Sequence, residues 1–200
     1  MTNERLAAFS DGVFAFAITL LVLDLHVPAE HGHATEPLLS LLHSDWTSYL
    51  AFLCSFYLIS IKWINHHNMV HEIERVDNGL LALNMLLLLF VCVVPFTTSL
   101  LADYATDPLA YQATMLYAAV WSIGGLTYTL FWVYAVKRGL VSEKHRRSGS
   151  GNRIVRYALG PVGYLFGGLV SLINVYAAIA IFIIVASTYL FPDRPSKQPS

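Results

Sequence analysis

Residues Arg5 to Pro28 read RLAAFSDGVFAFAITLLVLDLHVP, a stretch with the length and apolar character of a membrane helix that nevertheless carries two carboxylates. About 20 apolar residues cross the hydrocarbon core of a bilayer as a helix. An ionised side chain in that region is costly unless it finds hydrogen-bond donors or water. Asp11 and Asp24 therefore make this segment the most informative one about function.

The composition of the whole chain is that of a membrane protein. Of its 200 residues, 56% are hydrophobic and 12% are charged, and its mean hydropathy is +0.57. Soluble domains contain about 25% charged residues. The long apolar runs predict an all-α, polytopic membrane protein with a single domain over residues 1–200 and six transmembrane helices. We expect these helices at about 6–27, 46–64, 79–101, 109–136, 154–171 and 174–191, with a turn around Ser171 to Asn174.

The distribution of basic residues predicts the orientation of the chain. The segment from Lys137 to Arg156 holds seven of the twelve Lys and Arg residues, whereas the links 26–45 and 102–108 hold none. With six spans, every basic residue falls on or near one side, which the positive-inside rule makes cytoplasmic. We therefore expect a multi-pass protein of the cell membrane with both termini in the cytoplasm, and a basic cytoplasmic loop at 137–153.

The first helix has one face with a heptad-like spacing. At about 100° per residue, the members of this face are Gly12, Phe16, Thr19, Leu23 and His26. Such a seam suits several parallel copies of one helix packed around an axis. Asp11 lies on a flank of the seam, where a structural hydrogen-bond network is the favoured role and direct ion or proton binding is the alternative. Candidate donors on the same side are Arg5, His66, His67 and Asn84.

These residues resemble the signature of the transmembrane protein 175 family of potassium channels. The match consists of Arg5, Phe9-Ser10-Asp11 and the following GVFAFAITLLVLDL, then His66-His67, Asn84 and Pro95-Phe96. The resemblance implies a signature network at Arg5, Phe9, Ser10, Asp11, His67 and Asn84. It also implies six helices per repeat, with the first helix lining the pore. Animal members carry two repeats and dimerise, so a chain with one Phe-Ser-Asp is implied to form a homotetramer.

The same resemblance places the pore lining at Phe16, Thr19 and Leu23, which the helical spacing also puts on one face. The constriction is then hydrophobic, and bacterial relatives generally have Ile or Leu at the position of Phe16. The chain has no T-V-G-Y-G sequence, which excludes a potassium-channel filter of that type. The Thr19 hydroxyl has two readings: it replaces part of an ion's hydration shell, or it bonds back to the carbonyl of Ala15 or Phe16.

The leading hypothesis is a potassium-preferring ion channel whose partners are identical copies, the lipid bilayer and K⁺. The alternative is a proton- or cation-coupled transporter, or a proton-permeable channel, that uses Asp11 and the nearby histidines. We expect that the protein is not an enzyme and that it has no cofactor and no nucleic-acid partner. His67 and His71 share a helix face, but H-E-x-x-H is absent and we expect no metal site. The link after the first helix, on the predicted outer side, contains His31, His33 and His43. We expect it to be a solvated loop, and a pH or divalent-cation sensor is the alternative.

Overall fold

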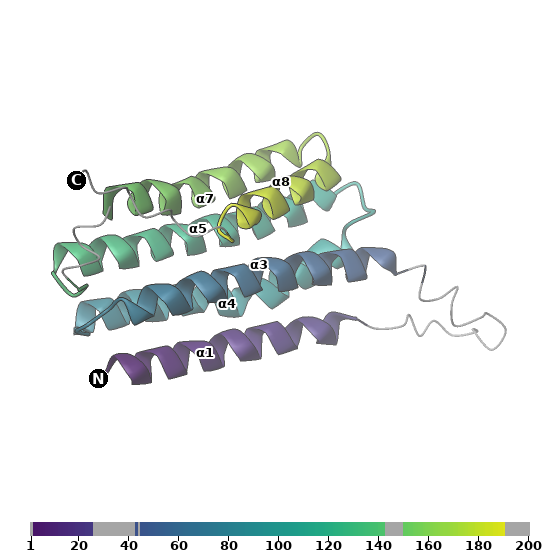
Figure 1. The fold of residues 1–200 in the computed structure, drawn as a ribbon. Helices are drawn as coiled ribbons and strands as arrows, with labels where there is room; N and C mark the ends of the chain where they lie inside the picture. Colours follow the sequence, from purple (N-terminus) through teal and green to yellow (C-terminus); the bar gives the residue numbers. More distant parts are fainter. Residues whose placement is uncertain (1, 26–42, 44, 143–149, 191–200) are drawn as a thin grey trace.

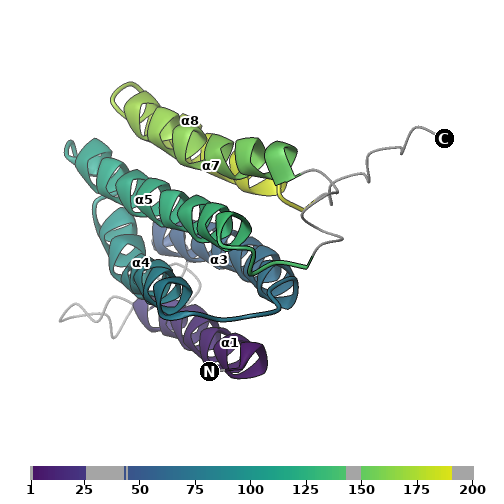
Figure 2. The same ribbon diagram turned by 90° about the vertical axis from the view of Figure 1, so that its left-hand side faces the viewer.

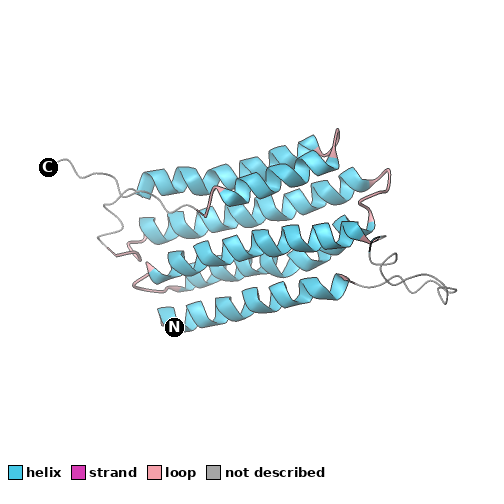
Figure 3. Cartoon of the chain, turned by 45° about the vertical axis from the view of Figure 1, so that its right-hand side comes forward, coloured by secondary structure: helices cyan, strands magenta, loops and turns pink. Residues whose placement is uncertain are grey.

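The computed structural model describes residues 2–25, 43, 45–142 and 150–190, and it is all-helical over those residues. Its six α-helices are α1 (Asn3–Leu20), α3 (Trp46–His71), α4 (Asn78–Asp103), α5 (Ala110–Lys137), α7 (Ser150–Val170) and α8 (Val175–Ser187). The short 3₁₀ helix η1 (Leu21–Asp24) continues α1. Figure 3 shows helices joined by turns and no strand among the described residues. The all-α prediction with six helices is confirmed.

Four segments among the described residues are long and apolar enough to cross a membrane: α1 with η1, α3, α4 and α5. The apolar helix α8 has only 13 residues, about 20 Å at 1.5 Å per residue, against about 30 Å of hydrocarbon. It forms a hairpin with α7, and the turn lies at residues 171–174, as predicted. Asn174 begins α8 by accepting a hydrogen bond from the amide of Ala177 at 3.0 Å.

Several predicted helix bounds differ from those in the structure. The second helix ends at His71 rather than at residue 64, because its polar residues find partners and remain helical. Asn65, for example, donates to the carbonyls of Ile61 at 2.8 Å and Tyr189 at 3.2 Å. The predicted loop 137–153 is shorter, since α5 includes Lys137 and α7 already begins at Ser150. The first helix begins at Asn3, and residues 26–27 of the predicted span lie outside the described residues.

The helices pack in layers with α1 at one side of the molecule. Figures 1 and 2 show α1 against α3 and α4, with α5 beyond them and the α7–α8 hairpin on the far side. Large side chains from several helices are fully buried in the core, among them Phe14, Tyr117, Phe131, Trp132 and Phe182. The hairpin is closely packed: a Cβ on Gly163 of α7 would lie 2.7 Å from Val185 of α8. The core therefore centres on α3, α4 and α5, and buried side chains of α1 and of the α7–α8 hairpin complete it on either side.

The turns at one end of the bundle are tied together. Gly139 ends α5 with φ of 64°, a left-handed conformation that favours glycine. The chain that follows pairs with the α3–α4 turn through an isolated bridge between Ile73 and Val141, and the amide of Glu74 donates to the carbonyl of Leu140 at 2.8 Å. These bonds hold the ends of α3 and α5 in a fixed position next to the start of α4.

Candidate functional site

Helix α1 has one packed face and one uncovered face. Its buried residues recur every three or four positions and contact α3 and α4; they are Leu6, Ser10, Phe14 and Ala17, followed by Leu21 of η1. The predicted seam lies on the other side. Phe16 is 64% exposed and Leu23 is 71% exposed; Thr19 between them and Gly12 before them are also exposed. Within a single chain, nothing among the described residues covers this apolar face.

Thr19 is the one hydroxyl on the uncovered face of α1 among the described residues. Its Oγ1 donates to the carbonyl of Phe16 at 2.8 Å, the back-bonded arrangement that was one of the two readings. This bond uses the hydroxyl proton and leaves the oxygen lone pairs unengaged. A lone pair is the part of a hydroxyl that coordinates a cation, so back-bonding and ion coordination are compatible at Thr19.

A buried polar network ties the packed face of α1 to α3 and α4. Asn84 Nδ2 donates to Ser10 Oγ at 3.0 Å, and Ser10 Oγ donates to the carbonyl of Leu6 at 2.9 Å. His66 Nε2 lies 3.0 Å from Asn84 Oδ1, which can only accept, so the ring nitrogen donates. All three polar side chains, Ser10, His66 and Asn84, are at most 1% exposed. Asn84 is therefore the centre of a three-helix hydrogen-bond network.

Asp11 belongs to a second polar cluster one residue further along α1. Trp63 Nε1 donates to Asp11 Oδ1 at 2.8 Å. His67 Nδ1 lies 3.5 Å from Asp11 Oδ2, an ion-pair contact without hydrogen-bond geometry. On its other side, His67 Nε2 lies 3.1 Å from His71 Nε2. Asp11 thus contacts Trp63 and His67 of α3, and His67 in turn contacts His71, which lies one turn further along the same face of that helix.

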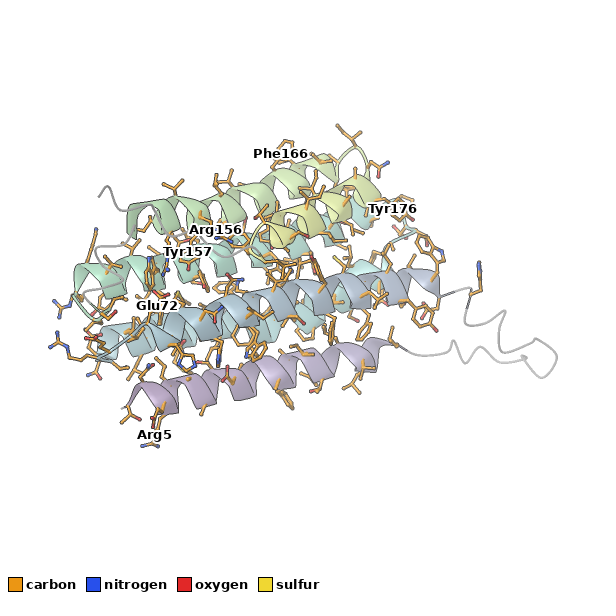
Figure 4. The ribbon with its side chains drawn as sticks, viewed as in Figure 1. Arg5, Glu72, Arg156, Tyr157, Phe166 and Tyr176 are labelled. Carbon is orange, nitrogen blue, oxygen red and sulfur yellow. The ribbon has the colours of Figure 1, made fainter. Side chains whose placement is uncertain are left out.

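The structure separates the candidate signature residues into three groups. Ser10 and Asn84 meet in the buried network, and Asp11 and His67 meet in the second cluster. Arg5 and Phe9 are exposed and contribute to neither, and Figure 4 shows Arg5 pointing away from the bundle. The side chain of Asp24 and the residues His26, His31 and His33 lie outside what the structure describes.

Sequence reasoning missed two features of these clusters. The contact of Trp63 with Asp11 went unnoticed, although Trp63, His67 and His71 follow the i, i+4 spacing of one helix face. The bond between His66 and Asn84 was not expected either. His66 and His67 point about 100° apart on α3, so one ring reaches α4 and the other reaches α1.

A third buried polar cluster lies in the core, away from α1. Thr98 Oγ1 donates to Ser55 Oγ at 2.7 Å, and Ser55 Oγ lies 2.9 Å from the hydroxyl of Tyr117. Thr98 also lies 2.9 Å from the carbonyl of Val94, in the helix turn that contains Pro95. This cluster joins α3, α4 and α5 and has no signature in the sequence beyond isolated hydroxyls in apolar runs.

The fold and the site define a multi-pass α-helical membrane protein in which one helix offers an apolar face that its own chain does not cover. Comparison with known proteins assigns the chain to a family within that class. The model of the family described as "Endosomal/lysosomal potassium channel TMEM175" matches residues 5–95. The chain is 39% identical to "Potassium channel Cha6605_3372" of Chamaesiphon minutus over 91% of this chain and 90% of that protein. The chain belongs to the TMEM175 family.

A further relative and a solved structure agree with this assignment. "Potassium channel B446_29190" of Streptomyces collinus is 34% identical over 99% of this chain and 98% of its own length. The crystal structure of "a lysosomal potassium-selective channel TMEM175 homolog" from Chamaesiphon minutus superposes with a TM-score of 0.84 at 37% identity, covering 94% of this chain and 96% of that one. The resemblance found in the sequence is therefore confirmed over nearly the whole chain.

Proposed function

We propose that the chain forms a potassium-preferring channel as a homotetramer, with α1 of each copy lining a central pore in the cell membrane. One observation carries this proposal: α1 packs on α3 and α4 through one face, and its opposite face is apolar and uncovered. The potassium-channel names of relatives that match nearly full length support the same function. The single repeat in this chain supports four copies rather than two.

The spacing along the uncovered face suits a series of rings around a pore. Phe16, Thr19 and Leu23 are three or four residues apart, which separates successive layers by about 4.5–6 Å along the helix axis. Gly12 precedes them, and a Cβ placed there would meet nothing within 4 Å in the single chain. Four copies therefore build two apolar layers with a layer of hydroxyls between them.

Such a pore selects ions through the cost of removing their water. An apolar ring conducts only when it is wide enough to stay wet, and a narrower ring gates by losing its water. K⁺ gives up its hydration shell more easily than Na⁺, so the pore favours K⁺ moderately. The Thr19 oxygens replace part of the lost shell. The phenyl rings of Phe16 set the width of the narrowest layer.

Ion flux from liposomes that contain the purified protein tests this proposal. We expect K⁺ flux to exceed Na⁺ flux, and Phe16→Ala to increase the flux and weaken the K⁺ preference. The matched control is Phe166→Ala, since Phe166 is 58% exposed on α7, on the opposite side of the molecule from α1 (Figure 4). Equal Na⁺ and K⁺ permeability, or the same response to both substitutions, would contradict the assignment of α1.

The number of copies is measured separately. Light scattering during size-exclusion chromatography gives the protein mass in detergent, and we expect four chains per particle. A monodisperse monomer or dimer with K⁺-selective flux would refute the tetramer while leaving the channel activity in place.

The orientation follows from the basic residues. The start of α1, the α3–α4 turn and the end of α5 lie at one end of the bundle (Figure 1). Arg5, Arg75 and Arg138 lie at that end, so the positive-inside rule favours it as the cytoplasmic one. Labelling of a single cysteine introduced at Arg138 in intact cells and in opened membranes tests this, with labelling only after opening as the expected result. A Cys54→Ala, Cys92→Ala background removes the native thiols.

The second candidate function is proton permeation, and the contact series Asp11–His67–His71 favours it. These titratable side chains are separated by 3.5 Å and 3.1 Å and connect α1 with the exposed end of α3. A pH-sensitive dye inside the liposomes measures proton entry under a potassium diffusion potential. Proton flux that His71→Gln abolishes while K⁺ flux persists would favour this path, and proton flux that is insensitive to it would exclude His71.

A further inference from the structure

His67 and His71 form a pair of imidazoles whose Nε2 atoms face each other. They lie on successive turns of α3, their ring centroids are 4.4 Å apart, and their Nε2 atoms are 3.1 Å apart. Both residues line an open cavity of about 580 Å³ at the end of the bundle where α3 finishes. Glu72, Arg156 and Tyr157 line the same cavity, and Figure 4 shows all three at this end of the bundle.

The separation of the two nitrogens matches that of two ligands on one metal ion. Histidine nitrogens bind Zn²⁺ at about 2.0–2.1 Å. Two such ligands are about 3.3–3.4 Å apart at the tetrahedral angle and about 2.9 Å apart at a right angle. The observed 3.1 Å lies between these values. The spacing of the two nitrogens, which bond to each other in this structure, is therefore compatible with two ligands on one metal ion.

An independent contact orients one of the rings for metal binding. His67 Nδ1 faces Asp11 Oδ2 at 3.5 Å, and the indole N–H of Trp63 holds the other carboxylate oxygen at 2.8 Å. The negative charge beside Nδ1 favours the tautomer protonated on that nitrogen, although the contact lacks hydrogen-bond geometry, and in that tautomer the lone pair of Nε2 is on the side of His71. Carboxylate–histidine–metal triads use this arrangement to fix the tautomer and strengthen the ligand.

We propose that His67 and His71 bind one transition-metal ion of the Zn²⁺, Ni²⁺ or Cu²⁺ type, with Asp11 as the residue that positions His67. Water completes the coordination, because no third His, Cys, Asp or Glu side chain among the described residues is placed to bind the same ion. Glu72, next to His71, is engaged by Arg153 at 2.5 Å. Imidazole ligands suit these metals, whereas Mg²⁺ and Ca²⁺ prefer oxygen ligands. The absence of an H-E-x-x-H sequence excludes a zinc-protease site of that type, but it does not exclude a metal site with two imidazole ligands.

Calorimetry on the purified chain, with any affinity tag of histidines removed, tests the proposal independently of ion flux. We expect Zn²⁺ and Ni²⁺ to bind and Mg²⁺ not to bind. His71→Gln is expected to remove one Zn²⁺ per chain, or to weaken that binding at least tenfold. Because His71 is exposed and, among the described residues, its side chain hydrogen-bonds to His67, this variant keeps the fold. The matched control is His43→Gln, which removes an exposed histidine outside the pair and keeps the binding.

Asp11→Asn tests the positioning role through the same measurement. Loss of a carboxylate that orients a metal-bound histidine typically costs about 10–100-fold in metal affinity. We expect that weakening at unchanged stoichiometry. The proposal is overturned if the wild-type chain binds no Zn²⁺, or if His71→Gln binds as many ions with the same affinity. Because neither readout uses conduction, a protein that binds Zn²⁺ but carries no K⁺ would refute the channel and leave the site intact.

Discussion

Replacing Asn84 by alanine should destabilise the packing of α1 more than any other polar substitution in the site. Asn84 is fully buried on α4, donates to Ser10 of α1 at 3.0 Å and accepts from His66 of α3 at 3.0 Å. Alanine removes both bonds at once. Ser10 still donates to the carbonyl of Leu6, whereas His66 loses the partner of its Nε2. The variant therefore leaves a buried imidazole N–H without an acceptor.

The expected loss follows from the value of such bonds in a membrane. Hydrogen bonds between helices contribute about 0.6 kcal/mol on average and up to about 1.7 kcal/mol in measured membrane proteins. Two of them give a loss of about 1–3 kcal/mol, which corresponds to a factor of about 5–150 in an equilibrium constant. His66 packs against Phe14 and Phe131 at ring distances of 5.3 Å and 6.2 Å, so water has little access to the orphaned group. The loss is therefore expected in the upper half of that range.

Unfolding in SDS, followed by tryptophan fluorescence, measures the change in free energy. Asn78→Ala is the matched control, since Asn78 is exposed at the start of the same helix, and surface substitutions usually change stability by no more than about 0.5 kcal/mol. Asn84→Leu, which keeps the volume, separates lost bonding from lost packing. If Asn84→Ala unfolds like Asn78→Ala, the network does not hold α1 in place.

Three further substitutions give distinct outcomes. Asp11→Asn should reduce the yield of assembled particles in size-exclusion chromatography more than it changes the K⁺/Na⁺ flux ratio; a well-assembled particle with altered selectivity would contradict this. Gly168→Ala should lower the thermal midpoint of unfolding, since the added Cβ would lie 2.7 Å from the Cβ of Ala118. Gly12→Ala is the control, because a Cβ there meets nothing within 4 Å. Equal thermal midpoints for the two variants would mean that α5 and α7 are further apart than in the structure. The backbone amide of Leu80, with Tyr134 and Arg138, holds the pKa of Asp77 below its usual value. The ionised Asp77 carboxylate therefore stabilises the folded protein fully above the pKa of the unfolded state, and this contribution is lost as the pH falls through the pKa of the folded state. Asp77→Asn should therefore lower the thermal midpoint at neutral pH and make no difference in strong acid, and a deficit that persists in acid would exclude the charge as its cause.

The apolar runs predicted the number of helices because length and hydropathy reflect the bilayer directly. They could not predict where α3 ends. The residues after Ile64 are polar, and a hydropathy criterion ends the helix there. In the structure, His66 bonds to Asn84 and His67 contacts Asp11, so the helix continues to His71. Contacts with α1 and α4 decide that boundary, and those contacts do not exist until the bundle has formed.

The periodicity of α1 identified its two faces, since a spacing of three and four residues fixes which side chains share a side. It could not say which face would be covered. Both faces contain phenylalanine, and burying Phe14 or Phe16 gains similar apolar area. The polar residues decide between them. Ser10 lies on the face of Phe14, and Asn84 can satisfy it only if that face turns toward α4. The buried hydrogen-bond network thereby turns Phe16, Thr19 and Leu23 outward, and the face proposed to line the pore is a consequence of a bond made on the opposite side of the helix.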